Sequence, residues 1–139
     1  MKNAVRAIAW SPAGLVLIRR DRPGIASYFV LPGGGVEPED PTLEDALRRE
    51  LNEEIGAAPE RIRHLTTMDR RPEGLDKLEH FFECTIPLVG ANFVGDEARD
   101  QGRGEYQLVT IHSRSELELI NLLPISIKSL ILANSKFEE

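Results

Sequence analysis

The chain has 139 residues, a length that fits a single domain with its own hydrophobic core, and we expect one domain over residues 1–139. Its composition, 41% hydrophobic and 29% charged, is ordinary for a soluble globular protein, and no apolar run is long enough to span a membrane. The formal net charge of −6 argues against a protein that coats DNA or RNA, but it allows a small phosphorylated ligand.

Cysteine content and the first residues bear on the cellular compartment. The single cysteine, Cys84, cannot form an internal disulfide. Arg6 interrupts the apolar run at the beginning of the chain and Pro12 ends it, so no signal-peptide pattern is seen. We therefore expect a cytoplasmic protein, monomer or homodimer, with neither a membrane nor a nucleic-acid polymer as its partner.

The first part of the chain predicts three strands. Residues 3–10 and 14–20 are rich in β-forming residues and are joined by a Ser-Pro-Ala-Gly turn, which is typical of a hairpin. Residues 27–31 form a third, short strand that runs into Pro32 and three glycines. We predict that these glycines, residues 33–35, begin a loop, because glycine allows unusual backbone angles and close backbone approach.

A helix is predicted next, over residues 42–55. Thr42 or Asp40 is suited to its N-cap, and Gly56 is suited to its C-terminal stop. On a helical wheel the apolar residues form one continuous arc, which predicts that this side packs against the protein body. The arc consists of Leu43, Leu47, Leu51 and Ile55.

The second half predicts more strands and a final helix. A polar loop over roughly residues 88–104 precedes the last of these strands, and Pro124 suits the first position of a helix over residues 125–135. The order of elements favours an α+β fold, a mixed β-sheet with a helix packed on each face. The three further strands are expected over residues 64–69, 77–86 and 105–111.

Three carboxylates lie close together on the first helix. Glu54 falls inside the apolar arc, Glu50 at its border and Glu53 beyond it, whereas a solvated acidic cluster would lie opposite the arc. Arg49 reaches Glu53 at i+4 spacing, which leaves Glu50 and Glu54 in need of a counter-charge. Mg²⁺ or Mn²⁺ takes carboxylate oxygen ligands, so we predict a divalent cation at this edge.

Residues Gly34 through Gly56 resemble the Nudix box of the Nudix hydrolases. The helical core of that motif, Arg49-Glu50-Leu51-x-Glu53-Glu54-x-Gly56, is complete. The loop glutamate of the family pattern falls on Pro41 at the standard spacing. Asp40, if the loop holds one extra residue, or Glu39 is the alternative for this position.

The resemblance implies a fold and a reaction. The fold is a Nudix-like α/β/α sandwich, and the reaction is metal-dependent hydrolysis of a nucleoside diphosphate linked to another moiety, by water attack on a pyrophosphate phosphorus. Suitable substrates are a nucleotide sugar such as ADP-ribose or a nucleoside triphosphate. The alternative function is a catalytically silent Nudix-fold module that binds a nucleotide as a sensor.

The resemblance also assigns roles to residues. Arg49 matches the arginine that orients a neighbouring carboxylate. Glu105 resembles a loop glutamate that contributes to the metal site or activates water in MutT-like members, and a surface acid at a strand start is the alternative. The implied catalytic residues are Glu53, Glu50, Arg49 and Glu105, and the implied metal ligands are Glu50, Glu53, Glu54, Gly34 and Asp40.

Substrate contacts require cations or exposed backbone. Arg19 and Arg20 lie at the end of the second strand and Arg22 just beyond it, and these three are our candidates for phosphate binding, with Gly35 as a backbone contact. The resemblance also bears on the base, since MutT-like members use an asparagine shortly before the last helix to choose an oxidised guanine. Leucine stands at the nearest aligned position, within residues 121–124, so that substrate is not supported.

Overall fold

The computed structural model describes residues 1–87, 99–100 and 104–137. Strands β1 (Lys2–Ser11) and β2 (Gly14–Asp21) pair antiparallel, which confirms the predicted hairpin. On the other side of β1, strand β6 (Lys77–Thr85) runs parallel to it, and β5 (Glu60–Asp69) pairs antiparallel with β6. Parallel and antiparallel pairs in one sheet make it mixed, as predicted.

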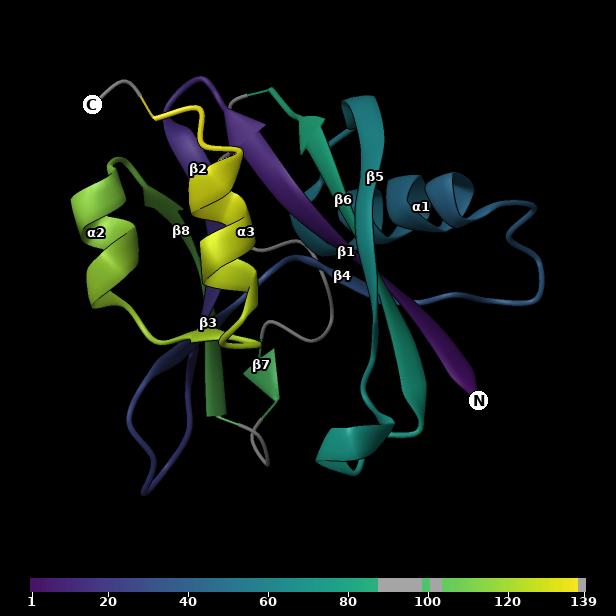
Figure 1. Cartoon of the computed structure of the whole chain (residues 1–139), viewed down its shortest axis with the longest axis horizontal. Coiled ribbons are helices and arrows are strands. Elements are labelled where there is room, and N and C mark those ends of the chain that lie inside the picture. Colours follow the sequence, from purple (N-terminus) through teal and green to yellow (C-terminus); the bar gives the residue numbers. More distant parts are fainter. Residues whose placement is uncertain (88–98, 101–103, 138–139) are drawn as a thin grey trace.

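The sheet continues beyond β2 with shorter strands. Its main order is β5-β6-β1-β2-β3-β9, with β8 also paired to β2 and β4 to β1 (Figure 1). The strands expected over residues 27–31 and 105–111 are therefore present, as β3 and β8. The bounds of the remaining strands are β3 Tyr28–Val30, β4 Gly33–Gly35, β7 Arg99–Asp100, β8 Gly104–Ile111 and β9 Leu122–Leu123.

Helices cover both faces of the sheet. Because side chains alternate along a strand, Val5 of β1 packs in one core with Leu51 of α1 (Leu43–Ile55), while Ile8 packs in another core with Ile131 of α3 (Ile127–Ala133). Figure 1 shows α1 apart from α3 and α2 (Arg114–Leu119), which lie side by side. The α+β class and the helix on each face are confirmed.

One local prediction was wrong, and one short helix was not predicted. The glycines expected to begin a loop form β4, in which Gly34 lies opposite Val5 of β1. Glycine has a low strand propensity, but it lets two backbones approach closely, and β1 supplied the pairing partner. The polar link after residue 111 contains α2, whose first turn is capped by Ser113, since Ser113 Oγ accepts a hydrogen bond from Glu116 N at 3.1 Å.

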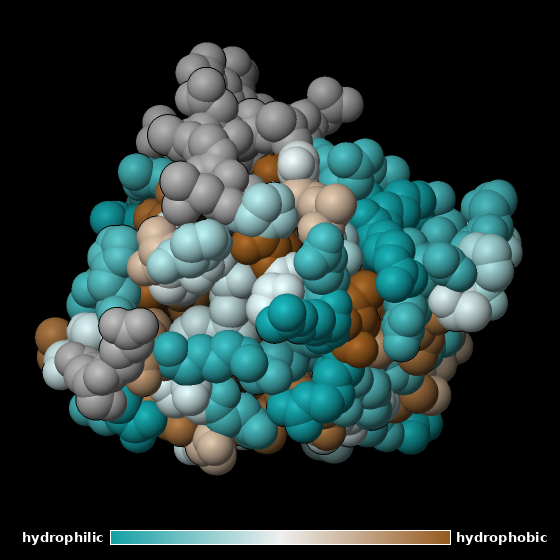
Figure 2. All heavy atoms as spheres, turned by 90° about the horizontal axis from the view of Figure 1, so that it is seen from above, coloured by the Kyte–Doolittle hydropathy of each residue, from teal (hydrophilic) through white to brown (hydrophobic). Residues whose placement is uncertain are grey.

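The surface is polar over much of the view in Figure 2, where hydrophobic side chains are seen in small separate patches. Within the described residues, no helix is both long enough and apolar enough to cross a membrane.

Candidate active site

Helix α1 is fixed at both ends by its caps. Thr42 Oγ1 accepts a hydrogen bond from Asp45 N at 3.1 Å, which selects Thr42 from the two candidate N-caps. Gly56 closes the helix in the left-handed conformation, with φ 65°. The apolar arc faces the core as predicted, so the acidic edge of the helix is held against the end of β4.

Arg49 is the centre of a network of charged groups beside α1. Its Nε and Nη2 donate to the two oxygens of Asp40 at 3.0 and 2.8 Å, a bidentate pair. Its Nη1 donates to Glu50 Oε1 at 2.9 Å and to Glu53 Oε2 at 3.1 Å, so the i+4 pair with Glu53 is confirmed. Nη2 also donates to the carbonyl oxygen of Gly35 at 2.9 Å.

Asp40, not Glu39, takes the place beside Arg49. The Asp40 side chain is 7% exposed and also accepts a hydrogen bond from Glu37 N at 2.8 Å, whereas Glu39 is exposed. The hydrogen bonds from Arg49, followed by that from Glu37 N, lower the pKa of Asp40 to about 2. Both Asp40 oxygens face the guanidinium, so this carboxylate holds Arg49 in place.

Glu50 and Glu54 lie against the backbone of β4. The Glu50 carboxylate is so close to Gly34 that a Cβ added there would meet Glu50 Oε2 at 2.3 Å. Glu54 Oε1 accepts a hydrogen bond from Gly33 N at 2.9 Å. The expectation that these two carboxylates lack partners within the protein was wrong, because Arg49 donates a hydrogen bond to Glu50 and the Gly33 amide donates one to Glu54.

The carboxylates of α1 differ in exposure, which affects whether they can bind a metal ion together. Glu50 is largely buried, whereas the Glu53 side chain is 56% exposed. In the part of the chain that the structure describes, no three acidic, histidine or cysteine side chains already converge as a metal-holding group. The donors nevertheless fit a hard divalent cation, since Glu50, Glu53 and Glu54 present carboxylate oxygens along one helix edge beside a glycine backbone.

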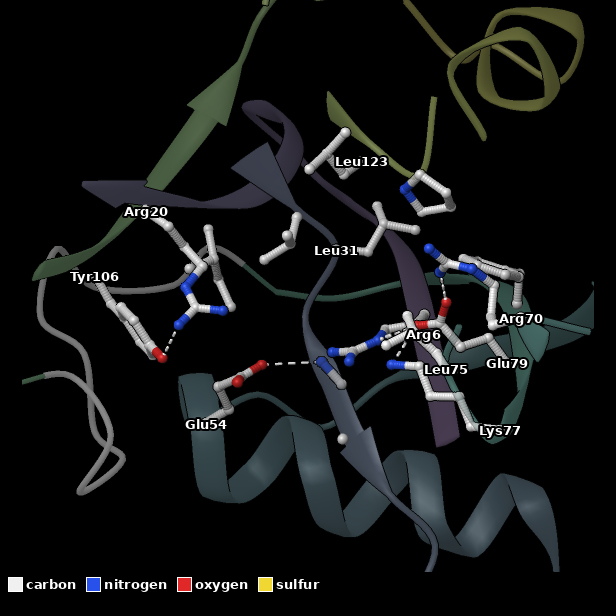
Figure 3. Close-up of a pocket in the computed structure, with 16 residues that line it drawn as sticks. Arg6, Arg20, Leu31, Glu54, Arg70, Leu75, Lys77, Glu79, Tyr106 and Leu123 are labelled. Carbon is white, nitrogen blue, oxygen red and sulfur yellow. Dashed lines mark hydrogen bonds and ion pairs between the residues drawn. The ribbon is translucent and has the colours of Figure 1, made fainter. Parts of the chain in front are cut away.

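A pocket of about 330 Å³ opens beside Glu54 (Figure 3). Four cationic and two acidic side chains line it, although the chain as a whole has a net charge of −6. A local excess of positive charge in an acidic protein favours an anionic ligand. The charged and aromatic hydroxyl side chains at its wall are Arg6, Arg20, Glu54, Arg70, Lys77, Glu79 and Tyr106.

Alternation along β2 places Arg19 and Arg20 on opposite faces, and Arg22 lies just after the strand. Arg20 lines the pocket, donates a hydrogen bond to the Tyr106 hydroxyl, and lies 4.2 Å from the Tyr106 ring centroid. Arg19 instead donates to Asp21 Oδ1 at 3.2 Å. Arg22 lies over the Tyr28 ring at 5.8 Å. Among the described residues that line the pocket, neither Arg19 nor Arg22 is found.

Sequence reasoning missed part of the pocket wall. Arg6, Arg70 and Lys77 were not among the predicted substrate contacts. Ala4 lies opposite Glu79 in the parallel β1–β6 pair, so Arg6, two residues further on the same face, reaches the Glu79 carboxylate. Only the pairing of β1 with β6 reveals this contact, because the residues are 73 positions apart.

Three further residues with side chains that can take part in chemistry have different surroundings. The backbone of Glu105 lies opposite Asp21 in the β2–β8 pair, but its side chain is outside the described part of the structure, so its role stays a prediction. His80 is a hydrogen-bonded core histidine, with ring nitrogens 2.9 Å from Asn3 Oδ1 and from Thr67 Oγ1. Cys84 is buried, and burial raises the pKa of its thiol to about 12, which disfavours the thiolate that a nucleophilic cysteine needs.

Comparison with known proteins agrees with the motif resemblance seen in the sequence. The family described as NUDIX domain matches residues 1–123. No curated protein matches the chain.

Solved structures with the same fold include a MutT protein from work on Aliivibrio salmonicida and Vibrio cholerae, at 19% identity and a TM-score of 0.62, covering 96% of this chain and 98% of that one. The ORF135 protein of E. coli is similar at 20% identity and a TM-score of 0.61, covering 96% of this chain and 89% of that one. The MutT protein of Bacillus halodurans is similar at 18% identity and a TM-score of 0.58, covering 99% and 85%.

Proposed function

This chain belongs to the Nudix hydrolase family, and on that basis we propose that it hydrolyses a nucleoside diphosphate linked to another moiety. Water attacks a pyrophosphate phosphorus, and the substrate is a small nucleotide: a nucleotide sugar such as ADP-ribose or a nucleoside triphosphate. The observation that carries the proposal is the position of Glu54. This residue of the Arg-Glu-Leu-x-Glu-Glu helix lines a pocket whose wall is mainly cationic.

We propose Glu50, Glu53, Glu54 and the Gly34 carbonyl as ligands of a divalent cation, Mg²⁺ or Mn²⁺. When bound, such an ion neutralises pyrophosphate charge and lowers the pKa of a coordinated water. Asp40 acts as a positioning residue, because both of its oxygens hold Arg49.

The protein groups have separate tasks in this mechanism. Arg49 orients the carboxylates of Glu50 and Glu53 through its Nη1 donors. The Gly33 amide fixes Glu54 at the pocket wall by its hydrogen bond to Oε1. Arg20, held by the Tyr106 hydroxyl, provides a cation for a substrate phosphate. No covalent nucleophile is required, since the attacking group is water.

Domain organisation, oligomeric state and location are proposed from the sequence alone. We propose that residues 1–139 act as one domain, as a monomer or homodimer. A cytoplasmic location stays a prediction from cysteine content.

The test is the variant Glu54→Gln. Glutamine keeps an oxygen that accepts from Gly33 N but loses the charge, so turnover should fall by roughly 100-fold or more while the melting temperature changes little. The assay is release of phosphate or nucleoside monophosphate from a panel of nucleoside diphosphate and triphosphate derivatives with Mg²⁺ or Mn²⁺.

Glu44→Gln is the matched control, since Glu44 is exposed on the same helix. Wild-type turnover by Glu54→Gln at saturating metal would disprove the metal role of Glu54. Binding of a nucleotide by the wild-type chain without product release would indicate a sensor module instead.

A further inference from the structure

Arg6, Arg70 and Lys77 gather around Glu79 at one end of the pocket (Figure 3). We propose that this group, the Glu79 cluster, is a subsite for a terminal phosphate of the substrate and selects substrates whose distal group is charged. The inference rests on the proposed function and names which part of the substrate this end of the pocket binds.

The cluster is organised by one buried carboxylate. Glu79 is 3% exposed, and its Oε2 accepts a hydrogen bond from Arg6 Nε at 2.9 Å. Arg70 Nη1 donates to the other oxygen, Oε1. Lys77 Nζ lies 3.7 Å from Oε2, beyond hydrogen-bond distance. A single buried carboxylate therefore fixes three cations in place, two of them by direct hydrogen bonds.

The charges of the cluster do not balance. Besides Glu79, the exposed Glu73 accepts from Arg70 Nε at 2.8 Å, so three cations face two carboxylates. Unbalanced charge that is partly buried is unfavourable unless an anion or water compensates for it. The excess positive charge lies at the pocket wall, where a ligand can reach it.

Hydrogen-bond donors also remain at this wall. Within the described residues, Arg6 makes its hydrogen bond through Nε, and its two Nη groups make none. The ammonium group of Lys77 carries three N–H donors, and Glu79 Oε2, which lies 3.7 Å from Nζ, accepts at most one of them. Both side chains line the pocket, so these N–H groups are available to phosphate oxygens.

The position of the cluster indicates which substrate group it binds. In Figure 3 the Glu79 cluster lies on the opposite side of the pocket from Arg20 and Tyr106, with Glu54 between them. A substrate whose pyrophosphate lies at Glu54 therefore extends toward cations in both directions. A terminal phosphate satisfies the second set of cations, whereas a neutral sugar leaves them uncompensated.

The test compares Lys77→Met with Lys2→Met. Lys2 is the direct neighbour of Lys77 in the parallel β1–β6 pair but is exposed and lies outside the pocket lining, so it is a matched control. We expect Lys77→Met to lower kcat/KM for a nucleoside triphosphate at least about tenfold relative to a nucleoside diphosphate sugar with a neutral sugar. The same measurement on a nucleoside diphosphate linked to a phosphorylated sugar shows which terminal phosphate the subsite binds. A similar fall in kcat/KM for this substrate indicates a sugar phosphate, and a fall for the triphosphate alone indicates the triphosphate tail.

Binding of inorganic triphosphate, measured by calorimetry without metal, separates this inference from the proposed function. The affinity should fall about tenfold in Lys77→Met and be unchanged in Lys2→Met. If the two variants and the wild-type chain bind triphosphate equally, the subsite does not exist. Selective loss of binding in Lys77→Met together with a wild-type chain that hydrolyses no substrate would support the subsite and reject the proposed function.

Discussion

At the scale of single residues, the Arg49–Asp40 pair accounts for the departure from the family motif. An aspartate is one methylene shorter than the glutamate of the pattern, and it occurs one position earlier in the chain. The loop holds this shorter side chain by an additional hydrogen bond from Glu37 N at 2.8 Å. The bidentate contact with Arg49 is thus made by a different residue at a different spacing, which the linear motif alone did not decide.

This pair predicts a dependence of stability on acid pH. The pKa of Asp40 is lowered from 3.8 to about 2 in the folded chain, so the unfolded chain binds the proton first as the pH falls. The stabilisation by Asp40 is complete above its unfolded pKa and is lost as the pH falls toward the folded value. In urea unfolding, Asp40→Asn should therefore flatten the fall in unfolding free energy between about pH 5 and pH 2.5.

Glu39→Gln is the control for this experiment, since Glu39 lies in the same loop and is exposed. Its pH profile should follow that of the wild-type chain. Parallel profiles for Asp40→Asn and the wild-type chain would show that the Asp40 charge does not contribute.

At the scale of elements, β4 and α1 form one unit. Strand β4 pairs with β1 through Gly33, Gly34 and Gly35, and the acidic edge of α1 packs onto this strand. A side chain at position 34 would occupy the place of the Glu50 carboxylate. Gly34 therefore has a steric role, which is to let a helix carboxylate touch the strand backbone.

Gly34→Ala tests this contact. The added Cβ would meet the end of the flexible Glu50 side chain at 2.3 Å, so the carboxylate should move while the fold adjusts. We expect kcat to fall on the order of tenfold or more with a loss of stability below about 1 kcal/mol. The measurements are turnover at saturating metal and the melting temperature.

Gly35→Ala is the matched substitution, because a Cβ there would meet nothing within 4 Å. It should keep both activity and melting temperature close to those of the wild-type chain. Equal activity of the two alanine variants would refute a steric role for Gly34.

At the scale of the whole molecule, the charge of the pocket wall is opposite in sign to the net charge of the chain. The chain has a net charge of −6, yet the pocket wall carries four cations and two carboxylates. The acidic edge of α1 meets this wall at Glu54. The arrangement brings carboxylates suited to a metal next to cations suited to phosphate, which is the combination that pyrophosphate chemistry requires.

This arrangement predicts that metal binding stabilises the fold. A ligand that binds the folded state alone adds about 2.7 kcal/mol at 100 times its dissociation constant. For a chain of this size we expect MgCl₂ to raise Tm by roughly 5–10 °C at that concentration. The measurement is thermal unfolding over a MgCl₂ series, with NaCl at matched ionic strength as the control.

The double variant Glu50→Gln/Glu54→Gln should show the same change in Tm with MgCl₂ as with NaCl. An equal rise in Tm with Mg²⁺ in the variant and the wild-type chain would contradict the proposed ligands.

The order of elements along the chain predicted the mixed sheet. The sequence by itself also determined the hairpin, the Gly56 cap of α1 and the Arg49–Glu53 pair, and it limited the N-cap to Thr42 or Asp40. These features depend on residue alternation, helical periodicity and contacts within four positions, which are local and can be read along the chain. The motif of α1 also indicated the family.

Only the tertiary structure decided that Asp40 holds Arg49, that Glu54 contacts the Gly33 amide, and that Arg6 and Lys77 surround Glu79 at the pocket. Lys77 and Glu79 are two positions apart on β6, whereas the other contacts join residues from different elements. They follow from strand pairing and from the packing of α1 on β4, and no local periodicity encodes either one.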